Sequence, residues 1–261
     1  MANSLVEFWR ECPLDKPPYI HPEDLPILRE KARWLDANDP LTFEHYLQSN
    51  RFGSPDDNRL HLSLFPVPYI GDLDTAEIFI LLLNPGFEYS DFWADNENAP
   101  FRKRIQQNLR QDFSDTDFPF LKLDPHFCWH SGFMWWEGKL RDIAQKIARD
   151  KFDKSYLSAL RDLSTKIACI ELIPYHSRSF GDSPLINRLP SVKHAKAFVT
   201  KTVVPKAQKK ECTIIATRQV ETWGLTDMDN VICYRDWETR GAHLNIKSRG
   251  GQAILKHYEI A

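Results

Sequence analysis

The sequence lacks long apolar runs. Its longest unbroken apolar stretch, from Ile78 to Leu83, has six residues, whereas a membrane-spanning helix needs about 20. The N-terminus also lacks the basic stretch followed by an apolar one that is typical of a secretory signal. We therefore expect a soluble, cytoplasmic protein with no membrane-spanning segment.

Paired cysteines are also absent. The five cysteines are widely spaced and include no Cys-x-x-Cys pair, which argues against a disulfide framework or a thiolate-held metal. The segment His126-Phe-Cys128-Trp-His130 offers only three candidate ligands. The chain has no Gly-rich nucleotide-binding loop of the Walker type and no Gly-x-Ser-x-Gly elbow. We expect neither a metal nor a cofactor.

Glycine is sparse, with 10 residues, and proline accounts for 17 of the 261. Apolar residues make up 42% and charged residues 27%, close to ordinary globular usage. This composition excludes disordered and collagen-like classes, and the length favours one large domain with additions. The net charge of −2 means that any nucleic-acid binding must depend on a local basic surface.

The order of apolar runs and amphipathic stretches predicts a fold class. Four short β-rich runs are expected to form strands at 77–83, 166–172, 212–216 and 230–234. Helices are expected at 4–11, 23–35, 41–48, 101–113, 136–150, 155–163, 193–210 (broken at Pro205) and 252–258. Strands alternating with helices indicate parallel βαβ units. We expect an α/β fold with three layers around a central four-stranded, mainly parallel sheet (residues 61–261) and an N-terminal helical extension (1–60).

Ligands of such folds bind beyond the carboxyl ends of the strands. Three segments lie there in this sequence: Leu83-Asn84-Pro85-Gly86, Glu171 through Arg178, and His243 through Gly251. Each by itself is compatible with an ordinary strand-ending turn, since Asn, Pro and Gly favour turns. Their joint occurrence is what indicates a site.

Together the three segments resemble the uracil-DNA glycosylase superfamily over roughly residues 65 to 258. Leu83-Asn84-Pro85-Gly86 is similar to the first motif of the mismatch-specific and single-strand-selective branches. The resemblance implies that Asn84 holds the attacking water and that His243 faces the target base. The family's late loop, His-Pro-Ser-Pro-Leu-Ser, has both prolines replaced here, by Leu244 and Ile246.

The resemblance implies DNA as the partner and a base extruded from the helix. The extruded base must then stack on an aromatic side chain. Phe101 is the first candidate, and Phe87 and Trp93 are the alternatives. A Schiff-base role for Lys247 is less compatible with its basic loop than a phosphate contact. The residues expected to contact DNA are Arg102, Lys103, Arg104, Asn245, Lys247, Ser248 and Arg249.

Two departures from the strict uracil enzymes bear on the substrate. Gly86 stands where those enzymes have a Tyr that blocks substituents on carbon 5 of the pyrimidine. In the family, the second such strand contributes an Asn whose amide pairs with uracil, and the residue of this sequence nearest to that place is Glu171. A carboxylate accepts a hydrogen bond from the exocyclic amine of cytosine. We therefore expect a monofunctional DNA glycosylase for a 5-substituted cytosine, such as the hydroxymethylated or glucosylated cytosine of some bacterial viruses, which makes a defence role conceivable by analogy.

Three other functions remain open from the sequence. The first is a uracil or mismatched-thymine glycosylase in base excision repair, and the second is a non-catalytic nucleic-acid-binding protein of the same fold. The third is an unrelated α/β enzyme that acts on a small metabolite. No obligate protein partner is evident from the sequence.

Overall fold

The computed structural model describes residues 4–31, 33–54, 57–181, 183–239 and 241–260. The chain forms two compact units, each of which is assembled from separate segments. The first contains Met1–Tyr69, Leu83–Asp112 and Glu171–Lys196, and the second contains Ile70–Leu82, Phe113–Ile170 and Ala197–Ala261. The division expected after residue 60 stays a prediction.

The sheet has five strands in the order β1-β3-β2-β4-β5. They are β1 (Tyr69–Ile70), β2 (Ile78–Leu82), β3 (Ile167–Glu171), β4 (Thr213–Ala216) and β5 (Val231–Cys233). β2 pairs with β4, and β4 with β5, both in parallel. The mixed α/β class and the four expected strands are confirmed. The expected number of strands is wrong by one, because β1 has only two residues and so shows no periodicity in the sequence.

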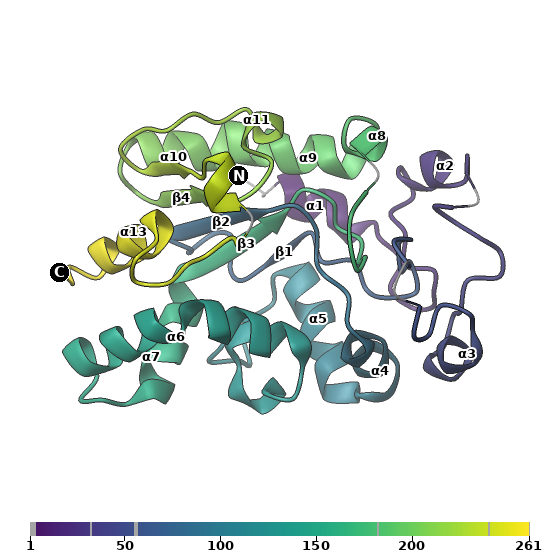
Figure 1. Ribbon diagram of the computed structural model, residues 1–261, viewed down its shortest axis with the longest axis horizontal. Helices are drawn as coiled ribbons and strands as arrows, with labels where there is room; N and C mark the ends of the chain where they lie inside the picture. The colour runs from purple at the N-terminus through teal and green to yellow at the C-terminus, as the bar shows by residue number, and fades with distance from the viewer. Residues whose placement is uncertain (1–3, 32, 55–56, 182, 240, 261) are drawn as a thin grey trace. The chain divides into compact units, whose positions relative to one another are not determined.

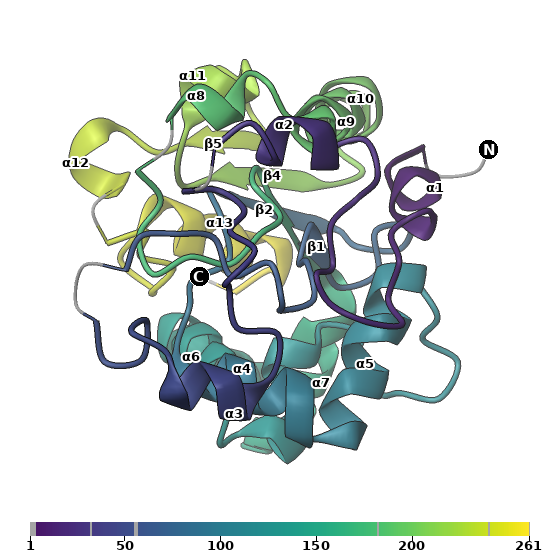
Figure 2. The same ribbon diagram turned by 90° about the vertical axis from the view of Figure 1, so that its right-hand side faces the viewer.

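Apolar side chains bury both faces of the central strands. Every residue of β2 and of β3 is buried, as expected for parallel strands covered by helices on both sides. Within the second unit, α10 (Val204–Gln208) lies on one side of the sheet, and α6 (Ser131–Lys151) and α7 (Tyr156–Lys166) lie on the other (Figure 1, Figure 2).

The remaining helices of the second unit are short. They are η1 (Leu121–Leu123), η2 (Pro125–Phe127), α11 (Val220–Trp223), α12 (Asp236–Thr239) and α13 (Arg249–His257). Among the helices of the described ranges, none has the length and apolar character needed to cross a membrane.

The helix expected over 193–210 continues past Pro205 instead of breaking there. α9 (Pro190–Phe198) leads into a π-helical turn, Val199–Val203, and then into α10. Proline has no backbone N–H, and its ring clashes with the carbonyl four residues earlier in a regular helix. A wider π turn just before Pro205 accommodates the ring.

Six helices lie entirely within the described residues of the first unit, and most of α9 belongs to this unit as well. The six are α1 (Ser4–Arg10), α2 (Leu25–Leu28), α3 (Phe43–Gln48), α4 (Tyr89–Glu97), α5 (Ala99–Arg110) and α8 (Ser183–Ile186). The helix expected over 23–35 is wrong in length, since among the described residues of this range only Leu25–Leu28 is α-helical. Asp24, just before it, is held by partners from elsewhere in the chain.

A buried polar network fixes the segment that follows β3. The Tyr175 hydroxyl donates to Asp24 Oδ2 over 2.7 Å, and the Ser191 N–H donates to Asp24 Oδ1 over 3.0 Å. The His21 N–H donates to the Tyr175 hydroxyl over 3.2 Å. All four residues are almost completely buried, and burial raises the pKa of Asp24. Since buried polar groups must be paired, this network holds the chain around Tyr175 in one place.

Candidate functional site

The Asn84-Pro85-Gly86 turn is bound along its length by the segment that follows β3. The Ile173 N–H donates to the Leu83 carbonyl over 2.7 Å, and the Ser177 N–H donates to the Pro85 carbonyl over 3.4 Å. His176 Nδ1 lies 2.7 Å from the Gly86 carbonyl oxygen. The turn is therefore held by tertiary hydrogen bonds as well as by its own Pro and Gly.

These contacts fix the orientation of the Asn84 amide. The amide nitrogen, Nδ2, lies 2.9 Å from the Pro85 carbonyl oxygen and 3.0 Å from Ser177 Oγ. A carbonyl oxygen only accepts hydrogen bonds, so the nitrogen and not the oxygen of the amide must face Pro85. Both Nδ2 hydrogens are then used. Oδ1 has no hydrogen-bond partner within the described part of the chain, and Asn84 is partly exposed.

The same contacts fix the tautomer of His176. Because the Gly86 carbonyl accepts, His176 Nδ1 must carry the proton, and a neutral ring then has its lone pair on Nε2. His176 is 6% exposed and Ser177 is 1% exposed. The pre-organised turn thus presents an amide oxygen that is available as a hydrogen-bond acceptor, and a histidine of defined tautomer is bound to the same turn at Gly86.

The residues expected to contact the base lie in different environments. Gly86 is exposed, and a Cβ built on it has no atom of the described structure within 4 Å, so there is room at this position. Glu171, the last residue of β3, is 5% exposed, and its N–H donates to the Pro68 carbonyl over 2.9 Å. Gly86 and Glu171 both belong to the first unit, together with Asn84.

Two of the three aromatic candidates for base stacking are buried, whereas the third, Trp93, is 38% exposed. Phe101 is 1% exposed on α5, and Phe87 is 4% exposed. The Phe87 ring stacks on His61 with centroids 3.6 Å apart, and it meets Tyr46 edge to face at 5.7 Å. A base could reach either ring only if the packing around it opened. Their stacking role stays a prediction.

Helix α5 carries the basic run expected to contact phosphates. Asn98 caps it by accepting from the Phe101 N–H over 3.0 Å, and the buried side chains recur with helical spacing, as Phe101, Ile105, Asn108 and Leu109. Arg102 and Lys103 are not among these buried side chains, and they line a cavity of about 350 Å³ together with Asn96 and Gln106. The Arg102 guanidinium lies over the Phe65 ring at 5.8 Å. Arg104 is only partly exposed.

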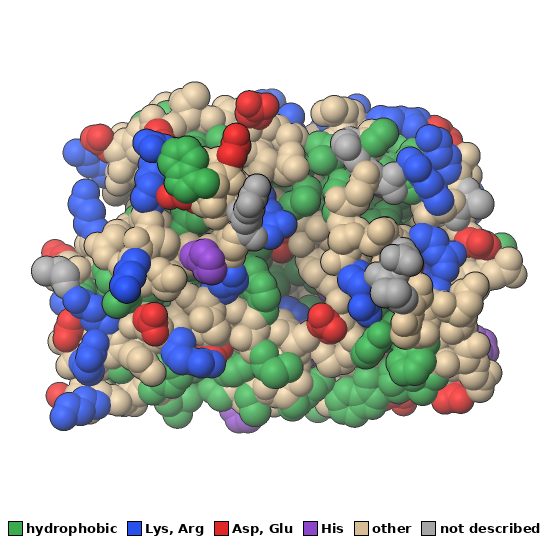
Figure 3. Space-filling view, in the orientation of Figure 1, with side chains coloured by type: hydrophobic (Ala, Val, Ile, Leu, Met, Phe, Trp, Pro, Cys, Tyr) green, Lys and Arg blue, Asp and Glu red, His purple; other side chains and the backbone are tan. Residues whose placement is uncertain are grey.

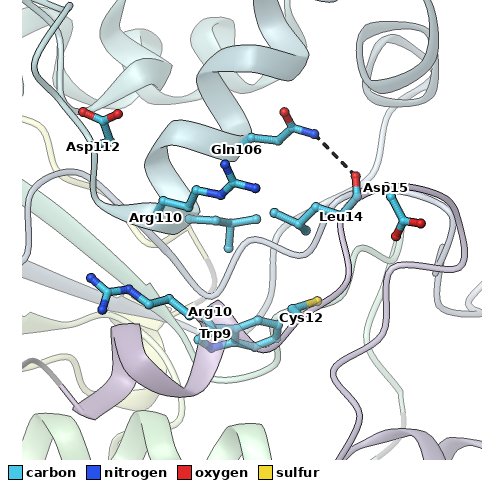
Figure 4. Close-up of a pocket in the computed structure, with 9 residues that line it drawn as sticks. Trp9, Arg10, Cys12, Leu14, Asp15, Gln106, Arg110 and Asp112 are labelled. Atoms are coloured by element: carbon cyan, nitrogen blue, oxygen red, sulfur yellow. Dashed lines mark hydrogen bonds between the residues drawn. The ribbon is translucent and has the colours of Figure 1, made fainter.

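A larger cavity of about 710 Å³ lies between α1 and α5 (Figure 4). Arg10 and Arg110 lie on opposite walls, and the Gln106 amide donates to the Leu14 carbonyl over 3.4 Å. Burial raises the pKa of the Cys12 thiol on its lining to about 12, so the nucleophilic thiolate is scarce at neutral pH. The cavity contains no residue of the Asn84 turn.

The late loop of the second unit forms the N-terminus of α13. Asn245 Oδ1 accepts from the Lys247 N–H over 3.0 Å and from the Ser248 N–H over 3.1 Å. Ser248 caps α13 by accepting from the Gly251 N–H over 3.0 Å. Asn245 and Ser248 therefore have structural roles without DNA, while Lys247 is exposed.

Arg249, also expected to contact DNA, is bound to other parts of the second unit. Its guanidinium donates to the Asp227 carboxylate over 2.7 Å and to the Cys233 carbonyl over 2.8 Å. Glu238 lies 3.4 Å away. Two carboxylates thus neutralise this arginine, and its geometry favours an anchoring role for α13.

His243 is exposed in the same loop. The Tyr234 hydroxyl donates to its backbone carbonyl, and Lys139 of α6 donates to the carbonyl of Gly241. A side chain at Gly241 would collide with the His243 ring. The loop backbone is therefore held on both sides of His243, and the expected donation from His243 to a departing base stays a prediction.

Among the described residues, no three His, Cys, Asp or Glu side chains converge as metal ligands. Cys128 is exposed, and Cys12, Cys169, Cys212 and Cys233 are buried free thiols. Ser177 and His176 were not assigned a role from the sequence, although they follow the second strand that carries site residues. The position just beyond a strand end was the signal that could have found them.

Comparison with known proteins identified no relative: no protein-family model, no curated protein and no solved structure matches this chain.

Proposed function

We propose that the protein is a monofunctional DNA glycosylase that excises an altered pyrimidine and leaves an abasic site. The observation that carries the proposal is the fixed Asn84 amide, whose nitrogen is held by Pro85 and Ser177. Its oxygen is then available to accept a hydrogen bond from water. The resemblance of Leu83-Asn84-Pro85-Gly86 to the first glycosylase motif supports the same role.

The chemistry requires a positioned water more than a strong base. When the N-glycosidic bond breaks, the base leaves with the electron pair and positive charge develops on the sugar. The water oxygen then adds to carbon 1′, and the proton that it loses passes through solvent to the departing base anion. An amide cannot remove that proton efficiently, but it can hold the water in line, and positioning of this kind contributes several kcal/mol to catalysis. Held by tertiary contacts, the Asn84 turn is suited to this task.

The substrate proposed is a 5-substituted cytosine. Two features support it: the open space at Gly86, and a largely buried carboxylate at Glu171. A carboxylate accepts a hydrogen bond from the cytosine amine and repels the uracil carbonyl at the same place. Gly86 leaves space for a group on carbon 5.

The proposal is tested with oligonucleotides that each carry one defined base: 5-hydroxymethylcytosine, its glucosylated form, uracil, thymine opposite guanine, or cytosine. We expect strand cleavage at the modified cytosines only after alkali, and release of the free base detected by mass spectrometry. Asn84→Ala should lose roughly 10²-fold or more in single-turnover rate. The matched control is Asn96→Ala, since the Asn96 amide donates to the Phe92 carbonyl of its own helix, α4.

The other outcomes separate the alternatives. Cleavage confined to uracil or mismatched thymine would retain the glycosylase class and remove the cytosine assignment. DNA binding without an abasic product from any of these substrates would identify a non-catalytic binding protein. Equal activity of Asn84→Ala and Asn96→Ala would show that Asn84 is only a turn residue.

A further inference from the structure

Two aromatic side chains of the first unit are exposed and in contact. Phe52 is 44% exposed and Tyr89, the first residue of α4, is 36% exposed. Their ring centroids lie 5.1 Å apart at an interplanar angle of 51°. Figure 3 shows apolar side chains gathered on the surface over α3 and α4. Exposed large apolar side chains that cluster in this way indicate a binding surface rather than core packing.

A cation completes this cluster. The guanidinium carbon of Arg178 lies 5.3 Å from the Tyr89 ring centroid. A hydrogen bond between the Arg178 and Tyr89 side chains raises the pKa of Arg178, and Arg178 is exposed. One surface therefore presents two aromatic rings and a permanent positive charge.

The rings rest on a rigid base. Tyr46, which is completely buried, meets Phe52 edge to face at 5.7 Å and stacks on Phe92 at 4.6 Å. Tyr46 and Phe92 belong to one core cluster of this unit. Because the supporting rings are packed, Phe52 and Tyr89 lose little further freedom when a ligand binds, which lowers the entropic cost of binding.

The cluster is continuous with the Asn84 turn along both chain segments that build that turn. Tyr89 follows Asn84 by five residues, and Arg178 directly follows Ser177, which accepts from the Asn84 amide. The two segments that fix the Asn84 amide thus also bring Tyr89 and Arg178 together. A ligand bound at Tyr89 and Arg178 therefore contacts the same two chain segments that hold Asn84.

We propose that Phe52, Tyr89 and Arg178 bind an unpaired nucleobase and its phosphate in single-stranded DNA, next to the nucleotide at Asn84. Aromatic rings stack on the faces of any base, and arginine supplies both phosphate contact and cation–π attraction. The proposed ligand is a strand of DNA. Its position next to Asn84 rests on the proposed glycosylase function. The binding itself is measured without catalysis.

The test uses a fluorescent oligodeoxythymidylate and an abasic oligonucleotide of the same length, with affinity measured by anisotropy. Tyr89→Ala and Phe52→Ala should each weaken binding of the thymidylate roughly 5- to 100-fold, with little effect on the abasic strand. Tyr89→Phe keeps the ring and should bind like the unmodified protein within about threefold. Arg178→Gln should weaken binding of both strands and reduce the salt dependence. Leu157→Ala, at a 49% exposed apolar residue of α7, is the control.

Three results would overturn the proposal. The first is no binding of the thymidylate by the unmodified protein, and the second is equal weakening of thymidylate and abasic binding in Tyr89→Ala. The third is a concentration-dependent dimer in sedimentation that Phe52→Ala abolishes, because the surface would then bind a second copy of the chain. If no DNA glycosylase activity is found while the thymidylate binds as expected, the proposed function fails and this inference stands.

Discussion

The Asn84 amide nitrogen and the Ser177 hydroxyl oxygen lie 3.0 Å apart, although 93 positions separate the two residues in the chain. The Pro85 carbonyl forces the nitrogen to face inward, and Ser177 takes its second hydrogen. Ser177 is almost completely buried, so its position is set by the packing around it. We infer that it orients Asn84 without touching the substrate.

The first prediction concerns this positioning role. Ser177→Ala removes the acceptor for one Nδ2 hydrogen, so the Pro85 carbonyl alone holds the amide, and its oxygen is less firmly oriented. We expect the single-turnover rate to fall about tenfold, equivalent to about 1.4 kcal/mol, with substrate affinity nearly unchanged. The measurement is the rate at saturating protein, together with the thermal unfolding midpoint.

A double-mutant cycle separates positioning from general support of the fold. In the Asn84→Ala background, Ser177→Ala should cause no further loss of rate. Ser179→Ala, which removes a neighbouring exposed hydroxyl that donates to Asn58, is the matched control. The same tenfold loss in both backgrounds would contradict the positioning role.

The second prediction distinguishes two basic residues of the late loop. Lys247 is exposed, so Lys247→Gln should weaken DNA binding to a similar degree across sequences and reduce the salt slope by about 1. Arg249 is bound to Asp227 and to the Cys233 carbonyl. Arg249→Gln should therefore lower the free energy of unfolding by about 1 kcal/mol.

Binding titrations at several salt concentrations and urea unfolding of both variants provide the measurements. If Arg249→Gln reduced the salt slope as much as Lys247→Gln and left stability unchanged, the guanidinium would have to leave its two carboxylates to contact DNA.

The third prediction concerns substrate choice. Glu171→Gln makes a weaker acceptor and can turn its amide donor inward, so activity on cytosine-type bases should fall by roughly 1–3 kcal/mol relative to uracil. Gly86→Tyr fills the open space at that position and should penalise the glucosylated base more than plain cytosine. Competition between two labelled oligonucleotides in one reaction gives the ratio of rates directly. An unchanged ratio in both variants would exclude these residues from the base pocket.

The fourth prediction is a pH dependence of stability. His61 is 2% exposed, and burial together with the neighbouring Arg51 places its pKa well below the usual value of 6.5. The unfolded chain therefore takes up this proton first as the pH falls, and stability is lost below about pH 6.5. At pH 5, which is about 1.5 units below the usual value, the loss from this group is at most about 2 kcal/mol, since one pKa unit corresponds to about 1.36 kcal/mol.

His61→Gln removes this titrating group. The difference in unfolding free energy between pH 7.5 and pH 5 should be smaller in this variant, by up to about 2 kcal/mol, even if the variant is less stable at both values. His126→Gln is the control, because the His126 side chain is 86% exposed. An identical pH dependence in His61→Gln and the unmodified protein would show that His61 is already accessible to protons in the folded state.

Local patterns in the sequence were sufficient for the central strands and the longer helices. Continuous apolar runs identified β2 and β3, and helical spacing of apolar residues identified α6. Local patterns predicted too long a helix at α2, where the Asp24 side chain is bound by Tyr175 and Ser191 from distant parts of the chain. They also missed α4, whose capping box at Glu88 and Asp91 is a local signal that was overlooked.

Neighbouring residues are enough to place Asn84 after a buried strand and in a sharp Pro-Gly turn, because strand and turn formation depend on local sequence. Local sequence does not fix which atom of the Asn84 amide faces outward, the burial of Phe101 or the binding of Arg249 to Asp227. These outcomes depend on residues distant in the chain, and burial and hydrogen-bond pairing between such residues are fixed only when the whole core packs. The side chains available for chemistry are therefore those that this packing leaves exposed and oriented.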